Sequence, residues 1–163
     1  MNGSGGLKIA AGVTALYVPA AGVKLTSTNV PTLAASGVSQ QGDASVSPSA
    51  STGRLTLKPG RYFIDVKLTI EGEYVTGTSG DATGTIAGQV YVAGSAVAGT
   101  KNKLNTQGDG APAVLAFGGI IEITKAQYDA ETNYVEVYLS SADASGNDVI
   151  PSEGQITAIR LDG

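Results

Sequence analysis

The stretch Arg54-Leu-Thr-Leu-Lys-Pro-Gly-Arg-Tyr-Phe-Ile-Asp-Val-Lys-Leu-Thr-Ile-Glu-Gly72 decides the fold class of this chain. It predicts a short strand, a turn at Pro59-Gly60 and a long strand. One face of the long strand carries Tyr62, Ile64, Val66, Leu68 and Ile70, and the other carries Phe63, Asp65, Lys67, Thr69 and Glu71. This alternation has the two-residue period of a β-strand with one buried face, not the 3.6-residue period of a helix. A strand of this length is not stable alone, so we expect other strands to cover its apolar side.

Further strands are indicated before and after this segment. Together with the two strands of this segment, at 55–58 and 61–71, we expect strands at 23–26, 85–92, 112–124, 133–141 and 155–161. One helical turn is predicted at Lys125–Ala130, because Thr124 and Gln127 have the spacing of a capping box. The segments 72–84 and 142–154 are predicted to be connections, and 94–110 is predicted to be mostly a connection, with room for a brief pairing at 96–98. Many strands with almost no helix predict an all-β sandwich or barrel.

Composition limits the function classes. The chain has the 163 residues of one domain, and 42% of them are apolar, enough for a core. The formal net charge is −4 and the ten Lys and Arg residues are scattered, which argues against nucleic acid as a partner. No run of about 18 apolar residues occurs, so we expect no membrane span. There is no Cys, which excludes disulfides and thiolate metal sites.

Catalytic signals are weak. The chain contains no His, which removes the Ser-His-Asp triad and most zinc sites. Paired carboxylates would still suit glycoside hydrolysis if two of them lay roughly 5–10 Å apart. Solvated strand charges are the competing explanation. The segment 143–148 gathers oxygen ligands but lacks the spacing of a calcium loop. We therefore expect a protein that is not an enzyme and that has no cofactor and no metal. The carboxylate candidates are Asp65, Glu71, Glu73, Glu122, Asp129, Glu131 and Glu136.

Two tyrosines stand out on the strand 133–141. Tyr134 and Tyr138 lie on the face opposite the apolar Val135, Val137 and Leu139. Large amphipathic rings on an outward face often mark a contact with another protein. The alternative is that they pack under a neighbouring loop of the same chain.

Three segments carry a resemblance to a known family. Leu57-Lys-Pro-Gly-Arg-Tyr-Phe-Ile64 resembles the Pro-x-x-Gly-x-Tyr-x-Phe start of a central strand in C1q-like and tumour-necrosis-factor-like domains. Ile121-Glu-Ile123, followed by Tyr134-Val-Glu-Val-Tyr-Leu139, is similar to paired strands of that family. Gln155-Ile-Thr-Ala-Ile-Arg-Leu161 resembles its closing strand, with Ile156 and Ala158 where the family has Phe and Gly.

The resemblance implies an antiparallel jelly-roll β-sandwich that forms a homotrimer. In that family, aromatic residues on the strand matching Tyr134–Leu139 line the three-fold axis. Carried onto this chain, the resemblance implies a trimer interface at Tyr134, Tyr138 and Tyr62.

The resemblance also implies a function. Such domains serve as bacteriophage decoration and spike proteins, and this chain is most similar in composition to a trimeric decoration (cement) protein on a phage capsid exterior. Assembly would occur in the host cytoplasm. Residues 1–22 would then form an N-terminal arm or attachment segment, and 23–163 the jelly-roll domain, although a strand also fits 7–18. The arm would contact the major capsid protein through Leu7, Ile9, Val13, Leu16 and Tyr17.

An alternative role stays open beside this one. A receptor-binding or carbohydrate-binding trimeric head of a spike or fibre would use a similar fold. Its loops at 76–84, 101–110 and 142–153 would recognise a host-surface glycan, because loops on a rigid sandwich commonly carry recognition.

Overall fold

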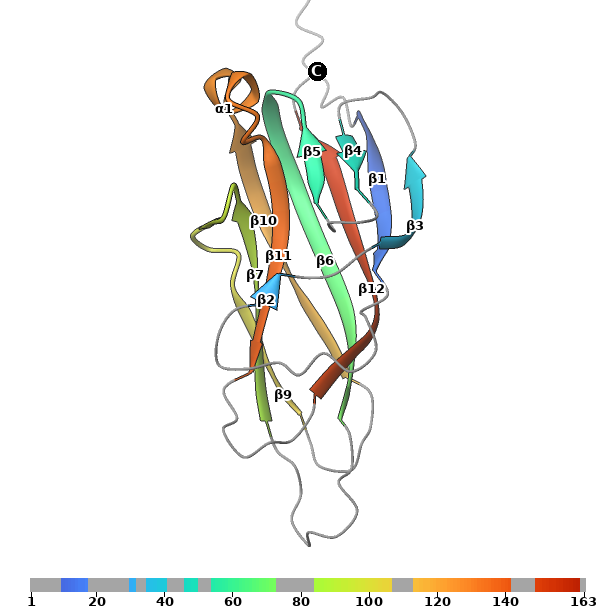
Figure 1. The fold of residues 1–163 in the computed structure, drawn as a ribbon. Helices are drawn as coiled ribbons and strands as arrows, with labels where there is room; N and C mark the ends of the chain where they lie inside the picture. The colour runs from blue at the N-terminus through green and yellow to red at the C-terminus, as the bar shows by residue number, and fades with distance from the viewer. Residues whose placement is uncertain are drawn as a thin grey trace, which may run out of the picture.

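In the part of the chain that the structure describes, the fold consists of two antiparallel β-sheets and one short helix (Figure 1). The computed structural model describes residues 10–17, 30–31, 35–40, 46–49, 54–72, 84–106, 113–141 and 149–161. The five-stranded sheet has the order β10 (Ala113–Ile123), β6 (Gly60–Gly72), β12 (Val149–Arg160), β1 (Ala10–Tyr17) and β3 (Ala35–Gln40).

The second, seven-stranded sheet has β11 and β7 at its centre. Its main path runs β4 (Val46–Pro48), β5 (Leu55–Leu57), β11 (Tyr134–Ser141), β7 (Gly84–Val92) and β8 (Ser95–Ala96). Beside this path, β2 (Val30–Pro31) pairs with β11, and β9 (Asn102–Thr106) pairs with β7. The predicted all-β antiparallel sandwich is therefore what the described residues form.

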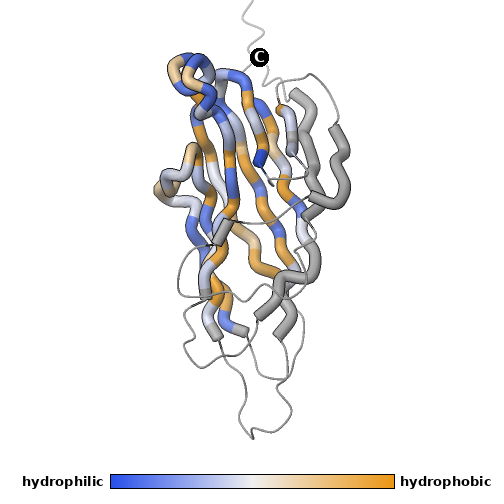
Figure 2. The backbone as a smooth tube through the Cα atoms, viewed as in Figure 1, coloured by the Kyte–Doolittle hydropathy of each residue, from blue (hydrophilic) through white to orange (hydrophobic). Residues whose placement is uncertain are grey.

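The core lies between the two sheets. Strand β6 supplies Tyr62, Ile64, Val66 and Leu68, which are at most 3% exposed. Strand β11 supplies three of the apolar side chains of the same cluster from the opposite sheet. Apolar and polar positions alternate along the strands in Figure 2, as expected where only one side of each strand faces the core.

The predicted helical turn is present as α1 (Lys125–Asp129), which joins β10 to β11 at one end of the sandwich (Figure 1). Its capping box is complete. The backbone N–H of Gln127 donates to the Thr124 hydroxyl oxygen at 3.2 Å, and the Thr124 N–H donates to Gln127 Oε1 at 2.9 Å. These bonds satisfy backbone donors at the start of a helix that has only five residues.

Two predicted connections are wrong in part, because strands run through them. Strand β9 occupies part of the predicted 94–110 connection and pairs with β7. Strand β12 begins at Val149, inside the predicted 142–154 loop, and pairs with β6 from its first residue. The register shifts between Pro151 and Glu153, where proline has no N–H to give to a ladder. The predicted strand at 23–26 lies outside the described residues.

The N-terminal segment contains a sheet strand. Strand β1 pairs with β12 on one side and β3 on the other. Val13, Leu16 and Tyr17 fall within it, opposite Ala158, Gln155 and Gly154 respectively. Leu7 and Ile9 lie outside the described residues. The sequence fitted either a strand or an attachment arm at 7–18, and residues 10–17 form a strand. The attachment role of residues 1–22 stays a prediction.

Among the described residues, no helix is both long and apolar enough to span a membrane.

Candidate functional site

The outer face of the seven-stranded sheet carries Tyr134 and Tyr138. The alternation predicted for β11 is present: Val135, Val137 and Leu139 are at most 1% exposed, while the two tyrosines are half-buried. Glu136 lies between them on the same side of the strand and is only 6% exposed. A carboxylate buried this far requires a charged partner.

Arg54 is that partner. Its Nε donates to Glu136 Oε1 at 2.8 Å, and its guanidinium carbon lies 4.1 Å from the centre of the Tyr134 ring. The neighbouring Tyr138 ring stacks on Tyr91 of β7, with 4.1 Å between ring centres. Burial raises the pKa of Tyr138, and the nearby Glu136 charge adds to the effect.

These rings therefore have partners inside their own chain, which supports the packing alternative for Tyr134 and Tyr138. Their contact with a second subunit stays a prediction. Tyr62 is different, because it is fully buried in the core of one chain and its hydroxyl donates to the Lys58 carbonyl oxygen at 2.9 Å. Its prediction as an interface residue is corrected, since a side chain with no exposed surface cannot contact a neighbour.

The outer face of the five-stranded sheet carries an apolar row that sequence reasoning missed. Ile120 of β10 lies directly opposite Phe63 of β6, and Phe63 lies opposite Ile159 of β12. Directly opposite residues share a face, so the three side chains form one line across three strands. Ile120 is 54% exposed and Phe63 39% exposed. We call Phe63, Ile120 and Ile159 the apolar row.

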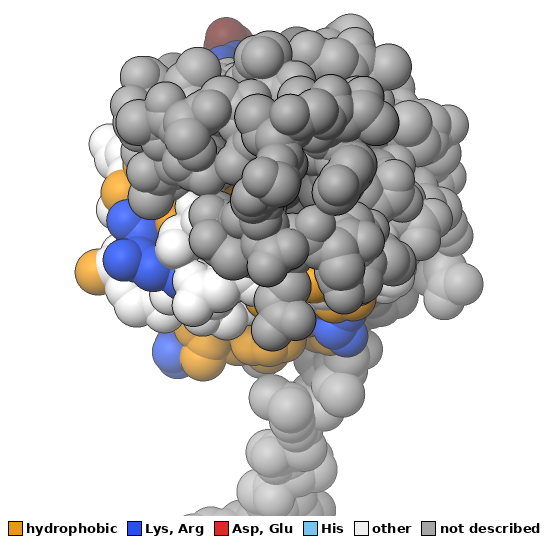
Figure 3. Space-filling model, turned by 90° about the horizontal axis from the view of Figure 1, so that it is seen from below, with side chains coloured by type: hydrophobic (Ala, Val, Ile, Leu, Met, Phe, Trp, Pro, Cys, Tyr) orange, Lys and Arg blue, Asp and Glu red, His pale blue; other side chains and the backbone are white. Residues whose placement is uncertain are grey.

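Charges of both signs surround this row. Arg61 and Glu122 face each other across β6 and β10 just beyond it, and Lys67 Nζ lies 3.3 Å from Asp65 Oδ2 on its other side. In the end-on view of Figure 3, described hydrophobic side chains gather along one edge of the molecule with basic side chains near them. An apolar centre with a polar rim is the usual composition of a protein contact.

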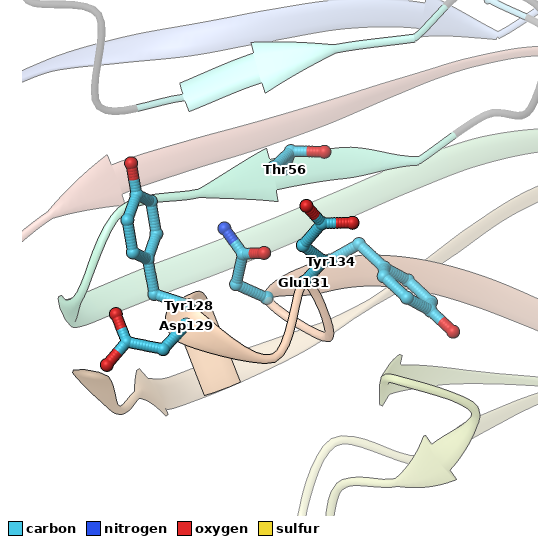
Figure 4. Close-up of a pocket in the computed structure, with 6 residues that line it drawn as sticks. Thr56, Tyr128, Asp129, Glu131 and Tyr134 are labelled. Carbon is cyan, nitrogen blue, oxygen red and sulfur yellow. The ribbon is translucent and has the colours of Figure 1, made fainter. Parts of the chain in front are cut away.

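A pocket of about 550 Å³ opens beside α1 (Figure 4). It lies between β5, α1, the turn after α1 and the start of β11. In Figure 4, the Tyr128 ring forms one side of the pocket, and the Glu131 side chain points toward Thr56. The residues that line it are Thr56, Tyr128, Asp129, Glu131, Asn133 and Tyr134.

Hydrogen bonds hold the turn that forms this pocket. The side-chain amide of Asn133 donates to the Leu57 carbonyl oxygen at 2.6 Å, which ties the turn to β5, and Asn133 is only 5% exposed. Glu131 has a positive φ of 57° and its N–H donates to the Tyr128 carbonyl oxygen at 3.1 Å. A positive φ is uncommon outside glycine, so the surrounding bonds are what keep Glu131 in this conformation.

Three of the carboxylates predicted as catalytic candidates form ion pairs, and the two that line the same pocket point in different directions. Asp65, Glu136 and Asp129 have Lys67, Arg54 and Lys125 as their respective cations. Asp129 and Glu131 line the same pocket, but in Figure 4 the two carboxylates point to different sides.

The other carboxylate candidates and the predicted oxygen-rich segment do not form a site in the described residues. Glu122 is exposed on the five-stranded sheet, the Glu71 side chain lies outside the described part, and so do Glu73 and the segment 143–148. Within the described ranges, no three His, Cys, Asp or Glu residues gather as a metal site would require.

Comparisons with known proteins identify the fold. Vertex protein P5 of phage PRD1 is similar over 97% of this chain and 100% of its own, with 12% identity and a TM-score of 0.51. Two crystal structures of murine APRIL are similar over 93% of this chain and 100% of their own, with 10% identity and TM-scores of 0.47 and 0.46. No protein-family model matches the sequence, and neither does any curated protein. The sheet topology and the similarity to P5 confirm the predicted antiparallel jelly-roll fold.

Proposed function

We propose that this chain is a homotrimeric structural protein of a phage virion, bound to the exterior of the capsid as a decoration or cement protein. The observation that carries the proposal is the exposed apolar row on the outer face of the five-stranded sheet. The sandwich that presents it is similar along 97% of its length to a phage vertex protein.

The apolar row supports self-association because of its position. Phe63, Ile120 and Ile159 lie on three neighbouring strands, β6, β10 and β12, and not on a loop, so a second copy can approach them across the face of the sheet. Charges of both signs at the rim, such as Arg61 and Glu122, let one copy complement another. If each of three chains buried its apolar row against a neighbouring chain, the result would be a closed trimer with no apolar row left exposed.

A structural role also agrees with the chemistry of the described residues. Three of the predicted carboxylates already have cations, as expected for charges that stabilise a fold. We therefore propose that the protein is not an enzyme and acts without a cofactor. Its partner in the particle would be the major capsid protein.

Attachment to the capsid is proposed for the N-terminal segment. Removing residues 1–19 would remove β1 and leave β3 without its partner strand, so that deletion would test the sheet as well as attachment. Removing residues 1–9 leaves every described pair of β1 in place. The shorter deletion should keep the solution mass and the melting temperature and lose capsid binding. Binding by the chain without residues 1–9 would count against attachment through Leu7 and Ile9.

The function is tested on phage particles made from a genome that encodes this chain. Quantitative mass spectrometry of purified particles should find the protein in a fixed ratio to the major capsid protein. Particles made without it should release their DNA at a lower temperature, as read by a DNA-binding dye, and added wild-type protein should restore the release temperature. An equal DNA-release temperature for particles made with and without the protein would overturn the proposal.

A further inference from the structure

We propose that the pocket beside α1 binds a neutral saccharide, with Tyr128 as the platform and Glu131 as the main hydrogen-bond acceptor. This function goes beyond the structural role and does not depend on it. It also differs in place from the glycan-binding loops expected at 76–84, 101–110 and 142–153.

The size and aromatic wall of the pocket suit a sugar ring. Its volume of about 550 Å³ lies within the range of roughly 300–1,000 Å³ that is typical of small-molecule sites. A pyranose has a flat face of C–H groups and a rim of hydroxyls, so it needs an apolar platform with polar groups beside it. The Tyr128 ring is 46% exposed and forms one side of the pocket in Figure 4.

The polar groups beside this ring are suited to hydroxyl ligands. The carboxylate of Glu131 accepts hydrogen bonds only, and the hydroxyl of Thr56 both donates and accepts. In Figure 4, Glu131 points toward Thr56. In the proposed complex, these two groups bond the hydroxyls at the rim of a ring that lies on Tyr128. The Asn133 amide N–H₂ is already bonded to Leu57 and holds the pocket floor in place.

The charges favour a neutral ligand over a charged one. Lys125 Nζ lies 2.7 Å from Asp129 Oδ1 and compensates that carboxylate, which leaves Glu131 to repel an anion. An organic cation would require open aromatic faces around it. One face of Tyr134 is already covered by the Arg54 guanidinium, whose positive charge would oppose a second cation. A neutral polyol meets neither obstacle.

The pocket is also formed before any ligand arrives. The capping box fixes the start of α1, and the Thr132 N–H donates to the Gln127 carbonyl oxygen at 2.9 Å after the helix ends. Asn133 ties the same turn to β5. A site held by such bonds loses little conformational entropy on binding, so even a shallow pocket gives measurable affinity.

The experiment uses the full chain, labelled with ¹⁵N, and four neutral probes. These are the methyl glycosides of glucose, galactose, mannose and N-acetylglucosamine, with choline as a cationic comparison. At least one glycoside should shift the amide signals of Thr56, Tyr128 and Glu131 in a saturable way. Choline should leave them unchanged.

Variants then separate the pocket from the rest of the surface. Tyr128→Ala should weaken binding roughly threefold to tenfold through loss of the aromatic contact, and Tyr128→Phe should retain most of it. Glu131→Gln should weaken binding as well. The control is Lys101→Gln, which changes an exposed charged side chain that does not line the pocket and should bind like the wild type.

Three outcomes would overturn the proposal: no saturable shift with any of the four glycosides, equal affinity in Tyr128→Ala and the wild type, or a response to choline alone. Thermal melting of each variant shows whether it is folded. If Tyr128→Ala does not fold, Glu131→Gln still tests the pocket, because it should weaken binding while keeping the shape of the side chain. Loss of glycoside binding would leave the virion proposal standing, and a negative particle test would leave the saccharide site standing.

Discussion

Replacing Ile120 by Asp should separate the proposed trimer into single chains. Ile120 is 54% exposed in one chain and lies opposite Phe63 in the apolar row. Full burial of an isoleucine side chain contributes roughly 1.5–3 kcal/mol, so covering the exposed half contributes roughly 0.8–1.6 kcal/mol per chain. An aspartate in its place would also bury an unpaired charge, at several kcal/mol per chain.

The sum over three chains decides the expected result. The loss is on the order of 10 kcal/mol per trimer, which raises the dissociation constant by roughly seven powers of ten. Light scattering after size exclusion should therefore report 16.3 kDa for Ile120→Asp, against about 49 kDa for three wild-type chains of 16.3 kDa. Circular dichroism should still show a β-sheet protein, because Ile120 is outside the core.

Two controls make this measurement specific. Ile120→Val keeps an apolar side chain in the row and should keep the mass of three chains. Tyr128→Asp places the same new charge on an exposed side chain away from the apolar row and should keep that mass too. A mass of three chains for Ile120→Asp would refute the row as the interface, and a wild-type monomer would refute the trimer itself.

Three further predictions concern the stability of the single chain. Arg54→Ala should lower the free energy of unfolding by roughly 1–3 kcal/mol in urea titrations, because it leaves Glu136, whose side chain is only 7% exposed, without its cation. Adding Glu136→Gln to this variant should recover part of the lost stability. Gly118→Ala should cost roughly 1–3 kcal/mol, because Gly118 has a φ of 155° and a Cβ there would collide with the Ile64 carbonyl oxygen; equal urea midpoints for variant and wild type would contradict this. Burial raises the pKa of Tyr138 above its ordinary 10.0, so the unfolded chain releases this proton first. The free energy of unfolding should therefore fall as pH rises above 10.0. Tyr138→Phe should reduce the slope of this fall in the same titrations, and an unchanged slope would show that other groups cause it.

The strands with clear alternation could be predicted from sequence, and those with breaking residues could not. The long strand expected at 61–71 is β6 at 60–72, because its two-residue period directly reports one buried face. Strand β12 was expected to start only at Gln155, since Pro151 and Gly154 are typical of loops. Pairing with β6 overrides that local preference, with a register shift after Pro151. Strand β9 was missed because Leu104 is its one apolar residue in the sequence, which is too few to show an alternating pattern.

The candidate sites were only partly accessible from sequence. The face of Tyr134 and Tyr138 follows from alternation within one strand, so it was predicted. The apolar row depends on which residue of β10 lies opposite Phe63, and cross-strand register is set by the whole sheet. The pocket depends on a positive φ at Glu131 and on the Asn133 bond to β5, neither of which has a signature in the residue pattern.

The pairing of β1 with β12 also affects how the chain reaches this fold. Ala10 lies opposite Arg160, so the five-stranded sheet cannot be completed until nearly all of the chain has left the ribosome. Sheets built from such distant segments fold slowly, in roughly milliseconds to seconds. Until β12 arrives, β6 keeps one edge unpaired, and open edges recruit strands from other chains. A chain that stops before β12 is therefore expected to aggregate during synthesis, and slower translation or a lower growth temperature should favour soluble protein.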